Sequence, residues 1–187
     1  FDNYDYSSDN LNSNFGNYET INTKEKLEDW LEKINNIYHF AIDLETSSLD
    51  DVDANLVGIS LAVEKGIACY IPVGHISSIN NTENDTQNIK DQLPLNYVID
   101  KLRPILEDPS ILKIGQNIKF DYKILLKYSV SLCSFEDTML MSYSLNAGLH
   151  RHNLDTLSER FLNHNPLKIE SLIGTGKNKK IFSEIPI

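Results

Sequence analysis

Apolar and polar positions along the chain follow two spacings, one typical of strands and one typical of helices. Short apolar runs with partial alternation predict strands, because successive side chains of a strand point to opposite faces. Apolar residues spaced three and four apart predict helices that bury one face. The predicted strands cover residues 18–21, 38–44, 55–63, 67–72, 111–115 and 130–133. The predicted helices cover residues 24–35, 94–106, 116–128, 138–145 and 154–162.

Local signals mark where these elements begin and how they join. Thr23 and Asp137 are favourable N-caps for the first and fourth predicted helices. A Gly-containing turn at residues 64–66 joins two strands into a hairpin. The later strands are separated by helices, so they are expected to run parallel. The sequence therefore predicts an α/β fold with a mixed sheet, built from an antiparallel hairpin plus parallel strands and flanked by helices.

Two stretches lack periodicity. Residues 1–17 and 77–92 are rich in Asn and Asp, which favour loops and turns. The first is predicted to be a flexible lead-in or linker, and the second a surface loop. One folded domain is expected over residues 18–187.

Composition narrows the class of protein. Apolar residues make up 41% and charged residues 24% of 187 residues, which is typical of a soluble globular domain. No apolar run approaches the roughly 20 residues of a membrane helix, and the acidic start carries no export signal. A cytoplasmic protein without membrane contact is expected. Cys69 and Cys133 lie in apolar surroundings without metal-ligand spacing, so both are predicted to be buried free thiols.

The formal net charge of −10 argues against a protein that binds nucleic acid by bulk electrostatics. It does not exclude a nucleic-acid enzyme, because carboxylates that bind metal ions add to the negative count while the bound ions reverse the local sign.

Three acidic residues carry the candidate chemistry. Asp43 and Glu45 follow an apolar run and lie two residues apart, so in a strand they share one face. Asp121 lies one turn into the third predicted helix, four residues after Asn117. Carboxylates without His or Cys partners favour Mg²⁺ or Mn²⁺. Two such ions roughly 3.5–4 Å apart are typical of phosphodiester hydrolysis.

The segments around these acids resemble a known family. Residues 43–50 and 113–121 resemble the first and second exonuclease motifs of the 3′-5′ exonuclease (proofreading) domain of bacterial family A DNA polymerases, the DNA polymerase I type. Residues 137–155 are similar to a third block of that domain, and the similarity extends over residues 18–187. The resemblance implies a ribonuclease H-like exonuclease fold, hydrolysis at single-stranded DNA 3′ ends, a polymerase domain in the parent chain, and a monomer.

The resemblance also implies roles for individual residues. Asp43 would bridge two metal ions, while Glu45 and Asp121 would complete the two sites. Leu49 and Phe120 could instead be ordinary core residues, and Arg151 could form a surface ion pair. The family usually has Tyr where Phe120 stands. The residues implied to contact the single strand are Thr46, Leu49, Gln116, Asn117, Phe120 and Arg151, of which Gln116 and Asn117 are also candidate helix caps.

One departure from the family concerns the end of the chain. The family's last motif is a Tyr and an Asp on a helix after the segment that residues 181–185 resemble, and this chain stops at Ile187. Together with a start at Phe1, this predicts a fragment or processed product with little activity on its own. The alternatives are a noncatalytic single-strand-binding or scaffold module, and an RNA-trimming exonuclease of the same fold.

Overall fold

The structure is a computed structural model that describes residues 16–76, 91–176 and 179–187. Most of the predicted lead-in and most of the predicted surface loop lie outside the described residues. Asn17, which the sequence assigned to the lead-in, begins the first strand.

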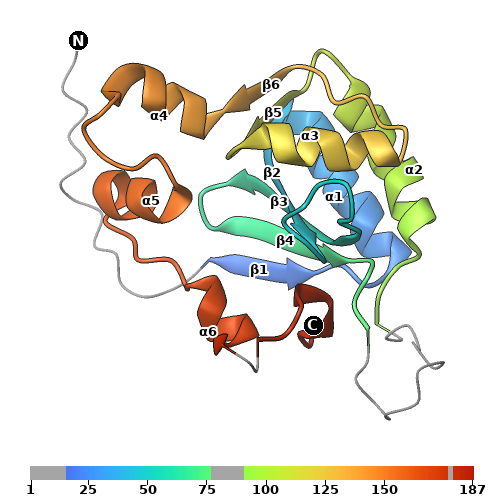
Figure 1. Cartoon of the computed structure of the whole chain (residues 1–187). Helices are drawn as coiled ribbons and strands as arrows, with labels where there is room; N and C mark the ends of the chain where they lie inside the picture. Colours follow the sequence, from blue (N-terminus) through green and yellow to red (C-terminus); the bar gives the residue numbers. More distant parts are fainter. Residues whose placement is uncertain (1–15, 77–90, 177–178) are drawn as a thin grey trace.

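Six strands of the described chain form one sheet in the order β1-β4-β3-β2-β5-β6 (Figure 1). Strand β3 pairs antiparallel with both β2 and β4, while β1–β4, β2–β5 and β5–β6 are parallel. This arrangement confirms the predicted mixed sheet with one antiparallel hairpin. The strands are β1 (Asn17–Thr20), β2 (His39–Thr46), β3 (Leu56–Glu64), β4 (Ile67–Pro72), β5 (Leu112–Gly115) and β6 (Phe135–Asp137).

All five predicted helices are present. Thr23 caps the first one as predicted, because its side chain accepts a hydrogen bond from the Lys26 amide. Tyr38 ends that helix with a φ of 58°. In the described ranges, no helix has the length and apolar character needed to cross a membrane. The helices are α1 (Lys24–Ile37), α2 (Leu95–Glu107), α3 (Ile118–Lys127), α4 (Thr138–Asn146) and α5 (Leu154–Leu162), followed by the unpredicted α6 (Ile169–Ile173) and the 3₁₀ helix η2 (Phe182–Glu184).

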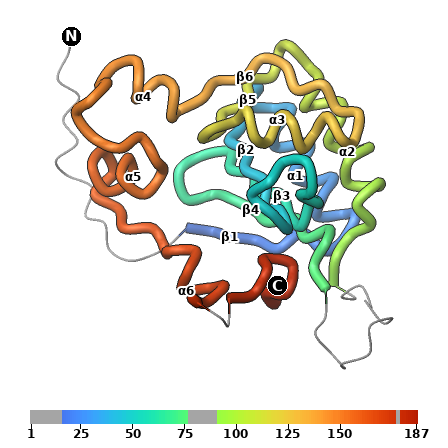
Figure 2. Tube along the Cα trace, in the orientation of Figure 1, coloured from blue at the N-terminus to red at the C-terminus, as the bar shows by residue number. Residues whose placement is uncertain are grey.

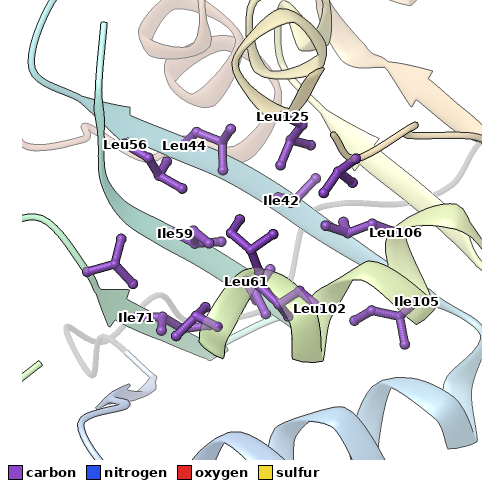
Figure 3. Close-up of a cluster of buried hydrophobic side chains, with 14 of the residues drawn as sticks. Ile42, Leu44, Leu56, Ile59, Leu61, Ile71, Leu102, Ile105, Leu106 and Leu125 are labelled. Carbon is purple, nitrogen blue, oxygen red and sulfur yellow. The ribbon is translucent and has the colours of Figure 1, made fainter. Parts of the chain in front are cut away.

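The main hydrophobic core lies on one face of the sheet. Alternation along β2 places Ile42 and Leu44 on this face, where Figure 3 shows them among Leu102 of α2 and Leu125 of α3. Each such side chain contributes roughly 1.5–3 kcal/mol by burial. The same alternation turns the intervening positions of β2 to the opposite face. Packing of the helices therefore fixes which side of the sheet carries the acids.

A buried lysine joins α2 to β5. Lys113 is fully buried, and its Nζ donates to the carbonyl oxygens of Ile105 (3.3 Å), Asp108 (2.8 Å) and Ile111 (2.7 Å). Burial lowers the pKa of the Lys113 amine. These bonds satisfy carbonyls at the end of α2 and hold β5 in line beside β2.

The strand predicted over residues 130–133 is wrong. Val130 and Leu132 are buried and alternate with more exposed neighbours, which produced the strand pattern. The amide of Val130 instead donates to Leu125 at the end of α3, and that of Cys133 donates to Leu106 of α2. The segment is a packed loop, and the strand β6 begins only at Phe135.

The two cysteines are free thiols, as predicted, but they differ in burial. Cys69 is 4% exposed and burial raises its pKa to about 12. Cys133 is only partly buried, which corrects the prediction for that residue. Its loop lies near the surface, where the Cys133 thiol donates to the Glu107 carbonyl at 2.9 Å.

Candidate active site

The three candidate acids come from two adjoining elements. Asp43 and Glu45 lie on β2, on the face opposite Ile42 and Leu44, and Asp121 lies in the first turn of α3. The Asp121 Oδ1 accepts a hydrogen bond from the buried Leu44 amide at 3.0 Å. This amide lies beyond Ala41, the last residue of β2 paired with β5. The Asp121 carboxylate therefore takes the place of a strand partner for β2 beyond the end of β5. This hydrogen bond holds Asp121 close to Asp43 and Glu45.

These acids line a cavity of about 610 Å³. One side comes from β2 and the following turn, and another from the start of α3. A third comes from α6 and the segment that leads into η2. Every predicted site residue except Arg151 lines the cavity, namely Asp43, Glu45, Thr46, Leu49, Gln116, Asn117, Phe120 and Asp121.

The environment of the acids disfavours their charged forms. Burial, and then the neighbouring Asp43, raises the pKa of Glu45 to about 7. Asp121 is 3% exposed, and burial followed by the Asp43 charge raises its pKa to about 7. Asp43 is more exposed, and partial burial of its carboxyl raises its pKa to a smaller extent. The cavity therefore holds acids that burial and mutual repulsion keep from ionising as readily as free carboxyls.

The raised pKa values predict how stability depends on pH. Between their ordinary pKa values of 4.5 and 3.8 and the raised value of about 7, Glu45 and Asp121 keep protons in the folded state that the unfolded chain has lost. The free energy of unfolding of the metal-free protein is therefore expected to fall as pH rises from about 4 to about 7. The expected loss is on the order of 3 kcal/mol.

Urea unfolding at pH 5 and pH 8, with and without MgCl₂, measures this effect. A divalent cation that binds the ionised acids should restore the stability lost at pH 8. Acids with lowered pKa values, such as Glu19 and Asp108, lose their stabilising effect only below this window and do not mask it. A stability at pH 8 that equals that at pH 5, and that Mg²⁺ leaves unchanged, would contradict a shared acidic site.

In the described residues, the three acids do not form a complete set of metal ligands. Within residues 16–76, 91–176 and 179–187, no three His, Cys, Asp or Glu side chains lie close enough together to hold a metal ion. The donor set nevertheless consists of carboxylate oxygens alone, and burial raises the pKa values of all three acids. By its chemistry it fits a hard divalent cation such as Mg²⁺ or Mn²⁺.

Asp137, and not Asn117, caps helix α3. The Asp137 carboxylate accepts hydrogen bonds from the amides of Asn117 (3.1 Å) and Ile118 (3.0 Å). It also accepts from Met139 and Leu140, which confirms it as the N-cap of α4. Asn117 occupies the cap position of α3 with a φ of 59° and makes no side-chain cap. The side-chain amide of Asn117 is therefore not used in a helix cap, and the residue lines the cavity.

Gln116 links the cavity to the chain before α5. Its Nε2 donates to the His152 carbonyl at 2.7 Å, and its Oε1 accepts from the Thr138 hydroxyl at 2.6 Å. Gln116 therefore positions the loop that contains Arg151. The Arg151 side chain is exposed and does not line the cavity. The proposed contact between Arg151 and a single strand stays a prediction.

Leu49 and Phe120 differ in how far they enter the core. Leu49 is 94% exposed, so it is not a core residue. Phe120 packs partly against the core and also lines the cavity. Leu49 lies in the turn that follows β2. Thr46, the last residue of β2, stabilises this turn, because its hydroxyl donates to the Ser48 carbonyl at 2.7 Å. The cavity thus has exposed apolar groups next to its acids.

Comparison with known proteins identifies the family. A family model described as 3′-5′ exonuclease matches residues 18–186. The chain belongs to this family. It is 36% identical over 179 residues to DNA polymerase I of Rhizobium leguminosarum and 33% identical over 173 residues to that of Pseudomonas aeruginosa. Each match covers 91% of this chain but 18% of the relative, so the exonuclease domain spans less than a fifth of these curated relatives.

Solved structures show that the exonuclease domain has the predicted ribonuclease H-like fold. The TM-score is 0.59 with Escherichia coli RNase D, an exoribonuclease, at 20% identity over 83% of this chain and 36% of that one. It is 0.64 with the catalytic core of RRP6 from Trypanosoma brucei, at 15% identity over 86% and 38% of the two chains. Brucella melitensis NrnC with bound Mg²⁺ gives 0.55 at 20% identity over 80% and 63%.

The sequence-based prediction missed one side of the cavity in the exonuclease domain. Ile169 and Ile173 of α6 and the segment from Lys179 to Phe182 all line it. Figure 2 draws this C-terminal part of the chain in red, and its 3₁₀ helix η2 contacts β2, the strand of Asp43 and Glu45. In the sequence, only the family similarity that extends over residues 18–187 covered this part of the chain, and it assigned these residues no role.

A second feature that the sequence did not reveal is the hydrogen-bonded pair of Tyr70 and His75, which lies near Glu45. The Tyr70 Oη lies 2.6 Å from Nε2 of the buried His75, whose Nδ1 lies 2.8 Å from the Ile185 carbonyl oxygen. Since Ile185 accepts from Nδ1–H, the Tyr70 hydroxyl donates to Nε2. Burial lowers the pKa of His75, whereas burial and the nearby Glu45 raise that of Tyr70. This pair ties the C-terminal segment to the acidic face of the sheet.

Proposed function

We propose that this domain removes nucleotides from single-stranded DNA 3′ ends by metal-dependent phosphodiester hydrolysis at Asp43, Glu45 and Asp121. The observation that carries the proposal is the convergence of these three acids, from β2 and α3, in one cavity where burial raises the pKa of each carboxyl. Family membership and the DNA polymerase I relatives support this chemistry and a DNA substrate.

The chain's own residues would bind and orient the reacting groups. Asp43, whose charge raises the pKa values of both other acids, would contribute to holding two ions, with Glu45 and Asp121 completing the sites. Mg²⁺ or Mn²⁺, when bound, would supply charge stabilisation at the phosphate and activation of water. The Leu44 amide holds one Asp121 oxygen, which leaves the other oxygen available as a ligand.

Side chains around the acids would receive the single strand. Leu49 and Phe120 offer apolar and aromatic surface to bases, which is the usual way of binding single strands without reading sequence. Asn117 offers an amide that is not used as a helix cap. Gln116, directly after β5, Arg151, in the loop before α5, and Thr46, at the end of β2, would add polar contacts.

Several broader expectations belong to the same proposal. The domain would extend over residues 18–187, act as a monomer in the cytoplasm, and be joined to a polymerase domain in the parent chain. The match to less than a fifth of each DNA polymerase I relative supports the last point.

A degradation assay tests the proposed function. A 5′-labelled DNA duplex with a single-stranded 3′ tail, and an identical substrate with an RNA tail, are incubated with Mg²⁺, Mn²⁺ or EDTA. The assay uses this chain and a chain extended beyond Ile187 along its own reading frame, because the implied last motif would lie there. Stepwise, metal-dependent shortening of the DNA tail is expected. Failure of both chains to shorten either tail with Mn²⁺ would refute the proposal, and equal rates on RNA would favour RNA trimming.

A further inference from the structure

The cavity of the acids also contains two lysines that the family resemblance did not assign. Lys179 and Lys180 line it together with Asp43, Glu45 and Asp121. They come from the segment between α6 and η2, far from the acids in the sequence. Both side chains are exposed. A strongly acidic cavity is thus edged by two positive charges.

The backbone of this segment is held firmly while the ammonium groups are not. The Lys180 amide donates to the Ile173 carbonyl at 2.8 Å, and the Lys179 amide donates to Gly176 at 3.3 Å. Farther along, the Ile76 amide donates to the Ser183 carbonyl at 2.8 Å. These bonds fix where the two lysines leave the backbone. Long side chains on a fixed backbone can reach a ligand in the cavity with little rearrangement.

Several other lysines of the described chain are engaged with protein groups. Lys26 and Lys101 pair with glutamates, and Lys127 donates to backbone carbonyls. In the ranges 16–76, 91–176 and 179–187, no ion pair involves Lys179 or Lys180. Their charges are therefore not used to stabilise the fold.

We propose that Lys179 and Lys180 bind phosphates of the single strand that flank the phosphate being hydrolysed. This inference rests on the proposed function. A nucleic acid strand brings several negative charges into a cavity that already holds three acids, within a chain of net charge −10. Ammonium groups at the rim offset this repulsion and bind phosphates as point charges, without selecting a base. The two lysines would thus act on strand binding, while the acids act on hydrolysis.

The salt dependence of binding tests this assignment. Binding of a 5′-fluorescein-labelled oligo(dT) of ten nucleotides is followed by fluorescence anisotropy in Ca²⁺ buffer at several NaCl concentrations. A gel after each titration confirms that the strand is intact. For single strands, each phosphate contact contributes about 0.7 to the slope of log affinity against log salt. A Lys179→Gln/Lys180→Gln variant should therefore reduce that slope by about 1.4, with roughly tenfold or greater loss of affinity at low salt.

A matched variant controls for net charge. Lys24→Gln/Lys101→Gln makes the same change on α1 and α2, where both ammonium groups lie over the Tyr97 ring. It should leave the salt slope unchanged. Thermal unfolding of both variants separates loss of binding from loss of folding. If the unsubstituted chain neither binds nor shortens oligo(dT), the proposed function fails. If it binds and the Lys179/Lys180 variant keeps its slope, only the assignment of the lysines is overturned.

Discussion

An Asp121→Asn variant is expected to release nucleotides roughly 10³-fold more slowly than the unsubstituted chain, and yet to be more stable in metal-free buffer at pH 8. Asparagine keeps an Oδ1 that can accept from the Leu44 amide, so α3 stays joined to β2. What is lost is one buried negative charge. The loss weakens the hold on a divalent cation, and it also removes the cost of burying a charge beside Asp43, which raises the pKa of Asp121 to about 7.

Two measurements on the same preparation check this prediction. The initial rate of shortening of a single-stranded 3′ tail is measured in Mg²⁺, and the urea midpoint is measured in EDTA at pH 8. Opposite signs of the two effects exclude simple misfolding as the cause of inactivity. Asp155→Asn, the same chemical change at an exposed position on α5, should leave the rate unchanged. An Asp121→Asn rate above about a tenth of normal would contradict the assignment.

The acidic part of the site could be predicted from the sequence because local rules decide it. A spacing of two places Asp43 and Glu45 on one face of any strand, and the buried positions Ile42 and Leu44 decide which face remains open. Helix periodicity places Asp121 one turn into α3. The parallel pairing of β2 with β5 then brings the end of one strand next to the helix that follows the other.

The remaining side of the cavity could not be predicted in the same way. α6 has five residues and η2 has three, so neither is long enough to show a period. Their positions depend on contacts distant in sequence, such as that between His75 and Ile185. The error at residues 130–133 has a related cause, because alternating burial also occurs in a loop that packs under α2 and α3.

The function of individual polar residues depended on partners that the sequence does not reveal. Asn117 and Asp137 were both acceptable helix caps by type. In the structure the Asp137 carboxylate caps α3 across a gap of about twenty residues, as well as α4. The Asn117 side chain is therefore not needed as a cap. The same carboxylate connects α3 and α4 at the carboxyl ends of the parallel strands β5 and β6. Residue type and spacing identify such candidates, whereas only tertiary contacts decide which of them remains available for binding.

Gly58→Ala is expected to cost about 3 kcal/mol of unfolding free energy and to slow nucleotide release on the order of 10²-fold. Gly58 pairs with Glu45 across β2 and β3. A Cβ atom there would lie 1.9 Å from the Tyr70 Oη and 2.2 Å from its Cζ. Tyr70 cannot simply move away, because its hydroxyl donates to the buried His75. The variant must therefore either leave His75 without that donor or displace β3 at the position that supports Glu45.

A double-mutant cycle with Tyr70→Ala identifies the clash as the cause. In the Tyr70→Ala background the extra methyl group of Gly58→Ala enters space that the ring has left, so its cost should fall below about 1 kcal/mol. Urea unfolding of the four proteins gives the interaction energy, and the tail-shortening assay shows whether Glu45 regains its position. A cost of Gly58→Ala that is the same in both backgrounds would mean that contact with Tyr70 does not explain the requirement for glycine. Partial recovery of activity in the double variant would show that the glycine serves the site by leaving room for Tyr70 beside Glu45.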